Sequence, residues 1–261
     1  MEVSAGFDEL YRATNGSRVY EEAVRASTQT LPDWLVPFSI IDGDLLERVA
    51  AELRIGERDT FLDLGCGAGG PGLWVAERTG ASLIGVDFAA NAVEAARLLA
   101  QKRKMTSRAR FMVADATATG MTASVSAVMS IDALMFIDAS SVATEIARVL
   151  KPGGMLVITA AESLVEPFLP TLVRDYRPIF ERAGFRTLLH EVPAGRHEQQ
   201  LAFYRALDES SERLRIEIGE AAEVLLEEAR NGLARAHQKT TRVRNVLFVA
   251  QRTCEKTGAA G

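Results

Sequence analysis

Residues 60–72 read Thr-Phe-Leu-Asp-Leu-Gly-Cys-Gly-Ala-Gly-Gly-Pro-Gly, and this stretch decides the fold. It begins as a short apolar run, which is typical of a buried strand. Five glycines follow from Gly65 to Gly72, and residues 73–78 have the character of a helix. A strand, a glycine turn and a helix in this order form half of a nucleotide-binding unit, in which the first-turn N–H groups of the helix point at the ligand. The glycines leave room for that ligand against the main chain.

Two classes of ligand use such a turn, and the glycines alone do not separate them. Gly65, Gly67 and Gly70 satisfy the dinucleotide pattern G-x-G-x-x-G. Asp87 ends the next expected strand, where that pattern has a carboxylate for the ribose. An NAD-dependent oxidoreductase is therefore one reading of the chain.

A second feature favours another class. Asp63 stands two residues before the first glycine, and the string Leu-Asp-Leu-Gly-Cys-Gly-Ala-Gly at 62–69 resembles motif I of the class I S-adenosylmethionine (SAM) methyltransferases. Lys-Pro-Gly-Gly at 151–154 resembles the turn that follows a helix in that family, and NAD-linked dehydrogenases do not usually carry it. The resemblance covers roughly residues 61–159, with a weaker match in the strands beyond.

The composition excludes several other classes. The chain has 261 residues, 48% of them hydrophobic and 25% charged, which is typical of one large globular domain or a domain with an insertion. A net charge of −5 is not the basic footprint of a nucleic-acid binder. No apolar run reaches the length of a membrane span, and the N-terminus lacks the apolar core of a secretory signal. Two cysteines, Cys66 and Cys254, make neither a disulfide framework nor a closed zinc site, so we expect free thiols in the cytoplasm.

The resemblance implies an α/β, Rossmann-like class I methyltransferase fold, with a seven-stranded, mostly parallel sheet, an antiparallel last strand and a helical lid insertion. The apolar patterns place strands at 60–64, 82–87, 109–114, 125–131, 155–159, 185–192 and 243–250. They place helices at 44–55, 73–78, 92–104 and 140–150, and through nearly all of 195–241. A further helix is expected over 167–183, broken or shifted near Pro170 and Pro178.

We expect four segments along the chain. Residues 1–43 form an N-terminal helical flap, 44–194 the SAM-binding core, 195–241 a helical lid over the substrate, and 242–261 the last strand with a C-terminal tail. Packing of the first segment against the sheet edge is the alternative to a flap. A solubilising hairpin or a dimer interface is the alternative to a lid. A homo-oligomer is therefore one possible form of the protein.

The resemblance also implies which residues hold the cofactor. Asp87 would accept hydrogen bonds from both ribose hydroxyls, and Phe88 would lie against the adenine. The remaining members are the motif I residues Asp63, Gly65, Cys66 and Gly67, then Asp115 and Ala116 near the adenine amino group, and Ser130 beside the methionine portion. The alternative to cofactor binding is, for Asp87, a role as the cap of the following helix. For Asp115 the alternative is a role in forming a turn.

Methyl transfer from SAM is an in-line displacement with a good, neutral leaving group, so alignment and exclusion of water supply most of the acceleration. A hydroxyl acceptor also needs a general base. Asp132, His197 and His237 are the candidates that the topology brings to the ligand side, with Glu162 as a further carboxylate and His190 as a structural residue within a strand.

Some family signatures are missing at these positions. Ser-Ile-Asp-Ala at 130–133 is not the Asn/Asp-Pro-Pro-Tyr/Phe of enzymes that methylate amino groups of DNA bases, and no histidine follows it. Ala-Ala-Glu at 160–162 lacks the Asp-Asn pair of metal-dependent catechol-type relatives, so we predict no metal.

Together these features predict a SAM-dependent methyltransferase that acts on a small apolar or aromatic metabolite, by O-methylation of a natural-product intermediate. N- or C-methylation, an NAD-dependent oxidoreductase and a non-methylating relative of the fold are the alternatives. The expected partner is a small-molecule methyl acceptor, with no nucleic acid and no membrane.

Overall fold

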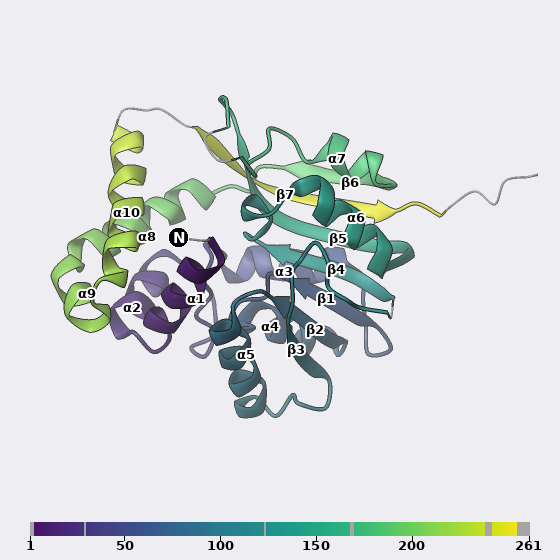
Figure 1. Ribbon diagram of the computed structural model, residues 1–261, viewed down its shortest axis with the longest axis horizontal. Coiled ribbons are helices and arrows are strands. Elements are labelled where there is room, and N and C mark those ends of the chain that lie inside the picture. The colour runs from purple at the N-terminus through teal and green to yellow at the C-terminus, as the bar shows by residue number, and fades with distance from the viewer. Residues whose placement is uncertain (1–2, 29, 123, 168–169, 238–241, 255–261) are drawn as a thin grey trace, which may run out of the picture.

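The computed structural model describes residues 3–28, 30–122, 124–167, 170–237 and 242–254. Its centre is a seven-stranded sheet with the order β3-β2-β1-β4-β5-β7-β6 (Figure 1). All neighbouring strands are parallel except that β7 runs antiparallel to β5 and to β6. The strands are β1 (Thr60–Leu64), β2 (Ser82–Asp87), β3 (Ala109–Val113), β4 (Val125–Ile131), β5 (Leu150–Ser163), β6 (Phe185–Glu191) and β7 (Val243–Arg252). The seven-stranded sheet and its antiparallel last strand confirm the predicted fold.

Helices cover both faces of the sheet, because successive side chains of a strand point to opposite faces. Phe61 of β1 packs into one apolar layer with α3 and α4, and Leu62 and Leu64 pack into the other with α6 and α7. The helices of these layers are α3 (Gly43–Leu53), α4 (Gly70–Thr79) and α5 (Ala90–Lys102) on the first face, and α6 (Ala139–Val149) and α7 (Arg177–Arg182) on the second. A short 3-10 helix, η1 (Leu134–Phe136), follows β4.

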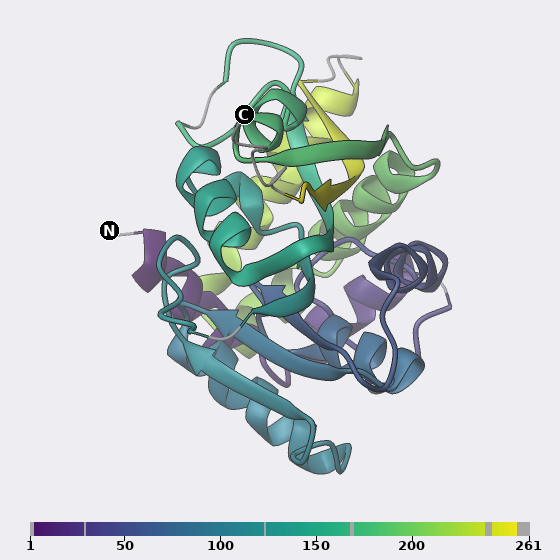
Figure 2. The ribbon, with the colours of Figure 1, turned by 90° about the vertical axis from the view of Figure 1, so that its right-hand side faces the viewer.

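A third apolar core lies outside the sheet, in a helical cap at the carboxyl ends of the parallel strands (Figures 1 and 2). The cap comprises α1 (Val3–Thr14), α2 (Arg18–Ser27), α8 (Arg196–Glu209), α9 (Ser211–Ile218) and α10 (Ala221–His237). Val24 of α2, Leu207 of α8 and Leu226 of α10 are fully or almost fully buried in its core. The N-terminal segment and the late insertion therefore share one core, although 180 residues of chain separate Arg18 from Glu198.

Two predicted elements were wrong in their extent. The helix expected over 167–183 is confined to α7, because Pro178 lacks an N–H and is accommodated in the first turn, where α7 begins. Residues 168–169 of that prediction lie outside the described residues. The strand expected to start at Met155 starts at Leu150, which pairs with Val125 of β4.

Lys-Pro-Gly-Gly at 151–154 therefore lies within β5 rather than before it. The register shifts between Val125 and Ala127, whose partners are Leu150 and Met155, so the four residues are accommodated at an irregularity of the strand. Gly153 has φ +77°, the left-handed region that glycine adopts without strain.

Among the described helices, none combines the length and apolar character that crossing a membrane requires.

One side chain of the late insertion caps the N-terminal segment. Glu217 of α9 accepts hydrogen bonds from the N–H groups of Arg18 (2.8 Å) and Val19 (3.0 Å) at the start of α2, and from the Ser17 hydroxyl (2.6 Å). A carboxylate is favoured there because the first N–H groups of a helix have no partner within it and carry positive partial charge. These hydrogen bonds also hold the pKa of Glu217 below its ordinary value.

We expect Glu217→Ala to lower the free energy of unfolding by about 1 kcal/mol, the typical value of a helix cap. Urea unfolding at pH 7 measures this, and Glu220→Ala, at an exposed neighbour, is the control. A lowered pKa means that the stabilisation is present at neutral pH and lost in acid, so wild type and Glu217→Ala should converge below about pH 4. Equal stability of all three proteins at pH 7 would contradict the cap.

Candidate active site

The glycine turn after β1 is held by the end of β2. The N–H groups of Gly65 and Cys66 both donate to the Val86 carbonyl oxygen, at 2.8 and 3.0 Å. Gly65 has φ +74°, and a Cβ at that position would lie 2.4 Å from Cβ of Ala133. Glycine is therefore required at this point by backbone angle and by space.

Asp87 connects this turn to the next helix. One carboxylate oxygen accepts from the Gly67 N–H at 2.8 Å and the other from the Ala89 N–H at 2.9 Å, just before α5 begins. The side chain also lines the main cavity described below. Burial raises the pKa of Asp87, and the N–H groups of Ala89 and Gly67 oppose that shift. Asp87 thus holds the chain just before α5, and ligand binding by its carboxylate stays a prediction.

Asp63 lies beneath the first turn of α4. A Cβ at Gly72 would come within 2.5 Å of its Oδ2, so glycine allows the helix to approach the carboxylate. Burial, and then the nearby Asp87, raise the pKa of Asp63 to about 8. Asp63 lines a small chamber with Gly65, Cys66 and Gly67. Without a partner, burial favours the protonated form of this carboxyl group. A cationic ligand group placed beside it would favour the ionised form and pair with it.

The main cavity has a volume of about 290 Å³ and lies between the sheet and the cap. Asp87, Phe88 and Ala116 line it from the core, and Phe203 and Leu225 line it from α8 and α10. A second set of aromatic residues comes from the N-terminal segment, where Phe7 packs edge-on against Phe88 with ring centres 6.1 Å apart; the others are Tyr11, Tyr20 and Phe38.

Tyr11 of α1 lies where the two chambers meet, since it lines both. A Cβ at Gly67 would be 2.5 Å from the Tyr11 hydroxyl oxygen, so the phenol lies directly over the glycine turn. Burial raises the pKa of Tyr11, and Asp87 and Asp63 contribute to the same shift. The place of Tyr11 could not be predicted, because nothing in its local sequence shows which strand end α1 covers.

Asp132 follows β4 and faces the main cavity in a fixed orientation. Its backbone is in the left-handed region, with φ +54°. Its Oδ1 accepts from the Thr159 hydroxyl and from Nη2 of Arg196, each at 2.7 Å. Arg196 is the first residue of α8, so this buried ion pair joins the cap to the sheet. Sequence reasoning missed Arg196, since an arginine at the start of a helix is ordinary.

Four other predicted site residues do not line either chamber. Asp115 is exposed, and its Oδ1 accepts from the N–H and hydroxyl of Thr117, each at 2.7 Å, which is the turn alternative. Ser130 is fully buried and donates to the Leu64 carbonyl at 2.7 Å. His197 and His237 are exposed on α8 and α10 and lie outside the chambers.

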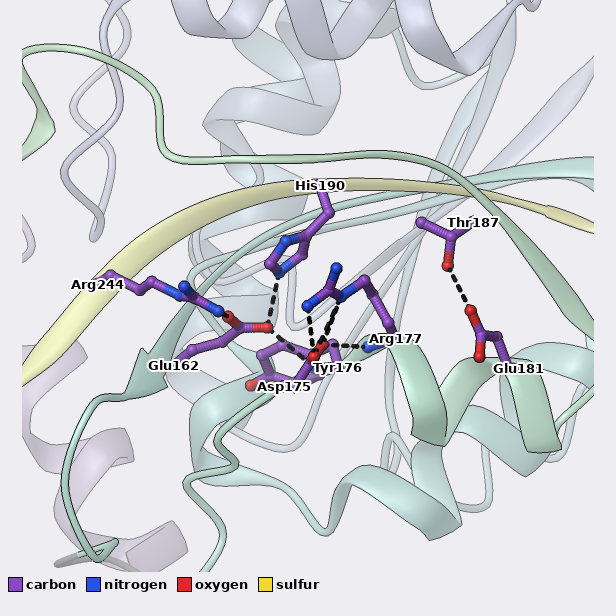
Figure 3. A network of polar contacts seen from close by, with 8 residues as sticks. All are labelled: Glu162, Asp175, Tyr176, Arg177, Glu181, Thr187, His190 and Arg244. Atoms are coloured by element: carbon purple, nitrogen blue, oxygen red, sulfur yellow. Dashed lines mark hydrogen bonds and ion pairs between the residues drawn. The ribbon is translucent and has the colours of Figure 1, made fainter.

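Glu162 also lines neither chamber, and belongs instead to a polar network at the end of β5 (Figure 3). Its Oε1 accepts from the Tyr176 N–H and meets Nε2 of His190, both at 2.9 Å, and its Oε2 pairs with Arg244 at 2.8 Å. Glu162, His190 and the neighbouring Asp175 come close enough to share an ion. Both carboxylates already pair with arginines, Glu162 with Arg244 and Asp175 with Arg177, so their charges are balanced.

Comparison with known proteins agrees with this geometry. Residues 62–158 match a family model described as a methyltransferase domain. The methyltransferase GfsG of Streptomyces halstedii is 31% identical over 176 residues, which are 60% of this chain and 63% of that protein. Geranyl diphosphate 2-C-methyltransferase of Saccharopolyspora erythraea is 28% identical over 146 residues, 48% of this chain and 50% of that protein.

A solved structure of the [4+2]-cyclase SpnF is similar with a TM-score of 0.70 at 22% identity, covering 80% of this chain and 81% of that one. At this identity the likeness concerns the fold. The matches to the two curated relatives span 63% and 50% of their lengths. The matched residues 62–158 run from the strand before the glycine turn to the strand that contains Lys-Pro-Gly-Gly. By this similarity, residues 62–158 are a methyltransferase domain, of the kind whose cofactor is S-adenosylmethionine.

Proposed function

We propose that this protein transfers a methyl group from SAM to a small, largely apolar acceptor bound beneath the cap. The observation that carries the proposal is the continuity of the main cavity. One space of about 290 Å³ is lined both by the cofactor residues Asp87 and Phe88 and by the cap residues Phe203 and Leu225. A cofactor and an acceptor held at its two ends would face one another away from water.

The residues of the core fit the cofactor. Asp87 would hold the ribose, Phe88 and Ala116 would flank the adenine, and the chamber of Asp63 and Gly67 would take the amino-acid portion. The raised pKa of Asp63 supports this placement, because a cationic amino group would stabilise its carboxylate. When bound, SAM supplies an activated methyl group for in-line displacement.

For a hydroxyl acceptor, Asp132 is the proposed general base. Arg196 and Thr159 occupy its Oδ1, and within the described chain no side chain hydrogen-bonds its Oδ2. That second oxygen is available to accept the acceptor's proton. O-methylation is thus our first candidate, and C-methylation is the second, because one relative is named a 2-C-methyltransferase. The similarity to SpnF, named a cyclase, supports a non-methylating reaction only through the fold.

Calorimetry with S-adenosylhomocysteine (SAH) and with NADH separates the two cofactor classes. We expect SAH to bind and NADH not to bind. Transfer of a labelled methyl group from SAM to hydroxyl-, amine- and carbon-nucleophile acceptors then tests the reaction. Binding of NADH without SAH, or SAH binding with no transfer to any acceptor class, would contradict the proposal.

We expect Asp87→Ala to weaken SAH binding at least tenfold, about the effect of losing charge-assisted hydrogen bonds. Asp115→Ala is the matched control, because both are aspartates at the end of a strand but Asp115 is exposed and lies outside the cavity. The control should stay within twofold of wild type. Equal affinities of Asp87→Ala and wild type would remove Asp87 from the site.

The pKa of Asp63 makes stability without ligand depend on pH. Its folded value of about 8 lies above the unfolded value near 4, so the folded state keeps a proton that the unfolded chain releases. Stability should therefore fall as pH rises from about 4 to 8, by at most about 1.4 kcal/mol per pH unit from this group. Asp63→Asn stays neutral, and denaturation at pH 5, 6, 7 and 8 should show a shallower fall for it. Parallel slopes for the two proteins would show that Asp63 ionises normally.

If Asp132 is the base, Asp132→Asn should lower kcat for a hydroxyl acceptor by about 10²- to 10⁴-fold. The affinity for SAH should stay within twofold, which separates loss of the base from collapse of the site. His197→Gln, an exposed position of α8 outside the cavity, should leave kcat unchanged. Full activity of Asp132→Asn would show that alignment alone suffices or that another group accepts the proton.

A further inference from the structure

The main cavity is lined by carboxylates and by no basic side chain of the described chain. Its charged lining residues are Asp87, Asp132 and Glu228, without lysine, arginine or histidine. Asp87 accepts two backbone N–H groups beside the glycine turn, and Asp132 is paired with Arg196, which lies outside the lining. Among the described residues, Glu228 is therefore the carboxylate of this cavity that is neither assigned to the cofactor nor given an ion pair with an arginine.

Glu228 is held at the cavity wall by two neighbours from α8. Its Oε1 accepts from the Tyr204 hydroxyl at 2.9 Å, and that hydroxyl accepts from Nε2 of Gln200 at 2.9 Å. Burial and then the charge of Glu228 raise the pKa of both Tyr204 and Tyr20, while Arg235 acts in the opposite direction on Tyr204. Within the described chain, no ion pair with Glu228 is formed, so its second oxygen is available to a ligand.

Aromatic rings line the same cavity as this carboxylate. Tyr20 packs edge-on against Phe203 with ring centres 5.8 Å apart and stacks on Phe38 at 5.7 Å, and all three line the cavity. The faces of such rings attract cations. An anion buried in the same space would meet carboxylates and no basic side chain of the described lining, which is costly.

From these charges we infer that the acceptor carries a protonated amine on an apolar frame and no phosphate or carboxylate, and that Glu228 binds the ammonium. The inference rests on the proposed function and deepens it, since it concerns the acceptor end of the same cavity. The amine is here a recognition group, whichever atom receives the methyl group.

Three compounds of the same shape test the inference: 1-adamantylamine, 1-adamantanol and adamantane-1-carboxylate. Calorimetry at pH 7 on protein saturated with SAH should show the amine binding at least tenfold more tightly than the alcohol, and the carboxylate binding most weakly. Glu228→Gln keeps the size of the side chain and removes its charge, so it should abolish the preference for the amine. Glu227→Gln, the adjacent glutamate outside the cavity lining, should retain it.

Tyr204→Phe provides a second variant, since it removes one hydrogen bond and leaves the carboxylate; the preference for the amine should persist. SAH affinity and thermal unfolding of every variant verify that the site is intact. Equal binding of amine and carboxylate, no binding by any of the three compounds, or an unchanged preference in Glu228→Gln would overturn the inference. If SAH itself does not bind, the proposed function fails instead, so the two failures are distinguishable.

Discussion

β7 runs antiparallel between β5 and β6, and the position of the cap depends on this one reversal. β6 ends, and β7 begins, at the edge where the parallel strands have their carboxyl ends, so the chain between them must lie over that edge. The glycine turn, Asp87 and Asp132 are at the same edge. The helices α8 to α10 consequently close a cavity above the cofactor residues instead of forming an appendage elsewhere.

The cap has to be held from both ends of the sequence to form an enclosed site. Its apolar core combines α1 and α2 with α8 and α10, and Glu217 of α9 caps α2. Arg196 adds an ion pair to Asp132 at the end of β4, in which the arginine is buried and the aspartate partly buried. A buried pair contributes little net stability after desolvation, but breaking it is costly, so it is better suited to fixing the orientation of Asp132 than to stabilising the fold. The cap and the proposed base are thus positioned by the same contact.

The sequence predicts the core much better than it predicts the cap. Strands 60–64, 82–87 and 125–131 were placed to the residue, because buried parallel strands are continuous apolar runs that end at glycine or aspartate. The residues of the glycine turn and Asp87 could be proposed from the sequence because they follow one another in a fixed local order along the chain, and the structure brings them together. Asp115 and Ser130 were placed in the site by analogy of position alone, and the structure puts them in a turn and between two strands.

Residues of the cap could not be found in this way, since their role depends on the rotation of helices that local periodicity does not determine. Glu227 and Glu228 are adjacent in the sequence and equally charged, and only one of them lines the cavity. His197 and His237 were candidate bases beside Asp132, yet both histidines are exposed. Arg196 carried no signal, because its partner is 64 residues away.

The division between core and cap also separates the two kinds of chemistry in this protein. Displacement at an activated methyl group needs mainly alignment of the reactants and exclusion of water. The same core can therefore support different reactions. The core contributes Asp63 and Asp87, two buried carboxylates whose charges suit a cofactor that carries positive charge. What distinguishes one acceptor from another must then come from α1, α2, α8 and α10, which contribute aromatic rings and Glu228 to the cavity. In the described chain, the cavity is lined by carboxylates and no cationic side chain, so under our proposal it excludes anionic acceptors first. The shape of its aromatic walls then discriminates among the remaining acceptors.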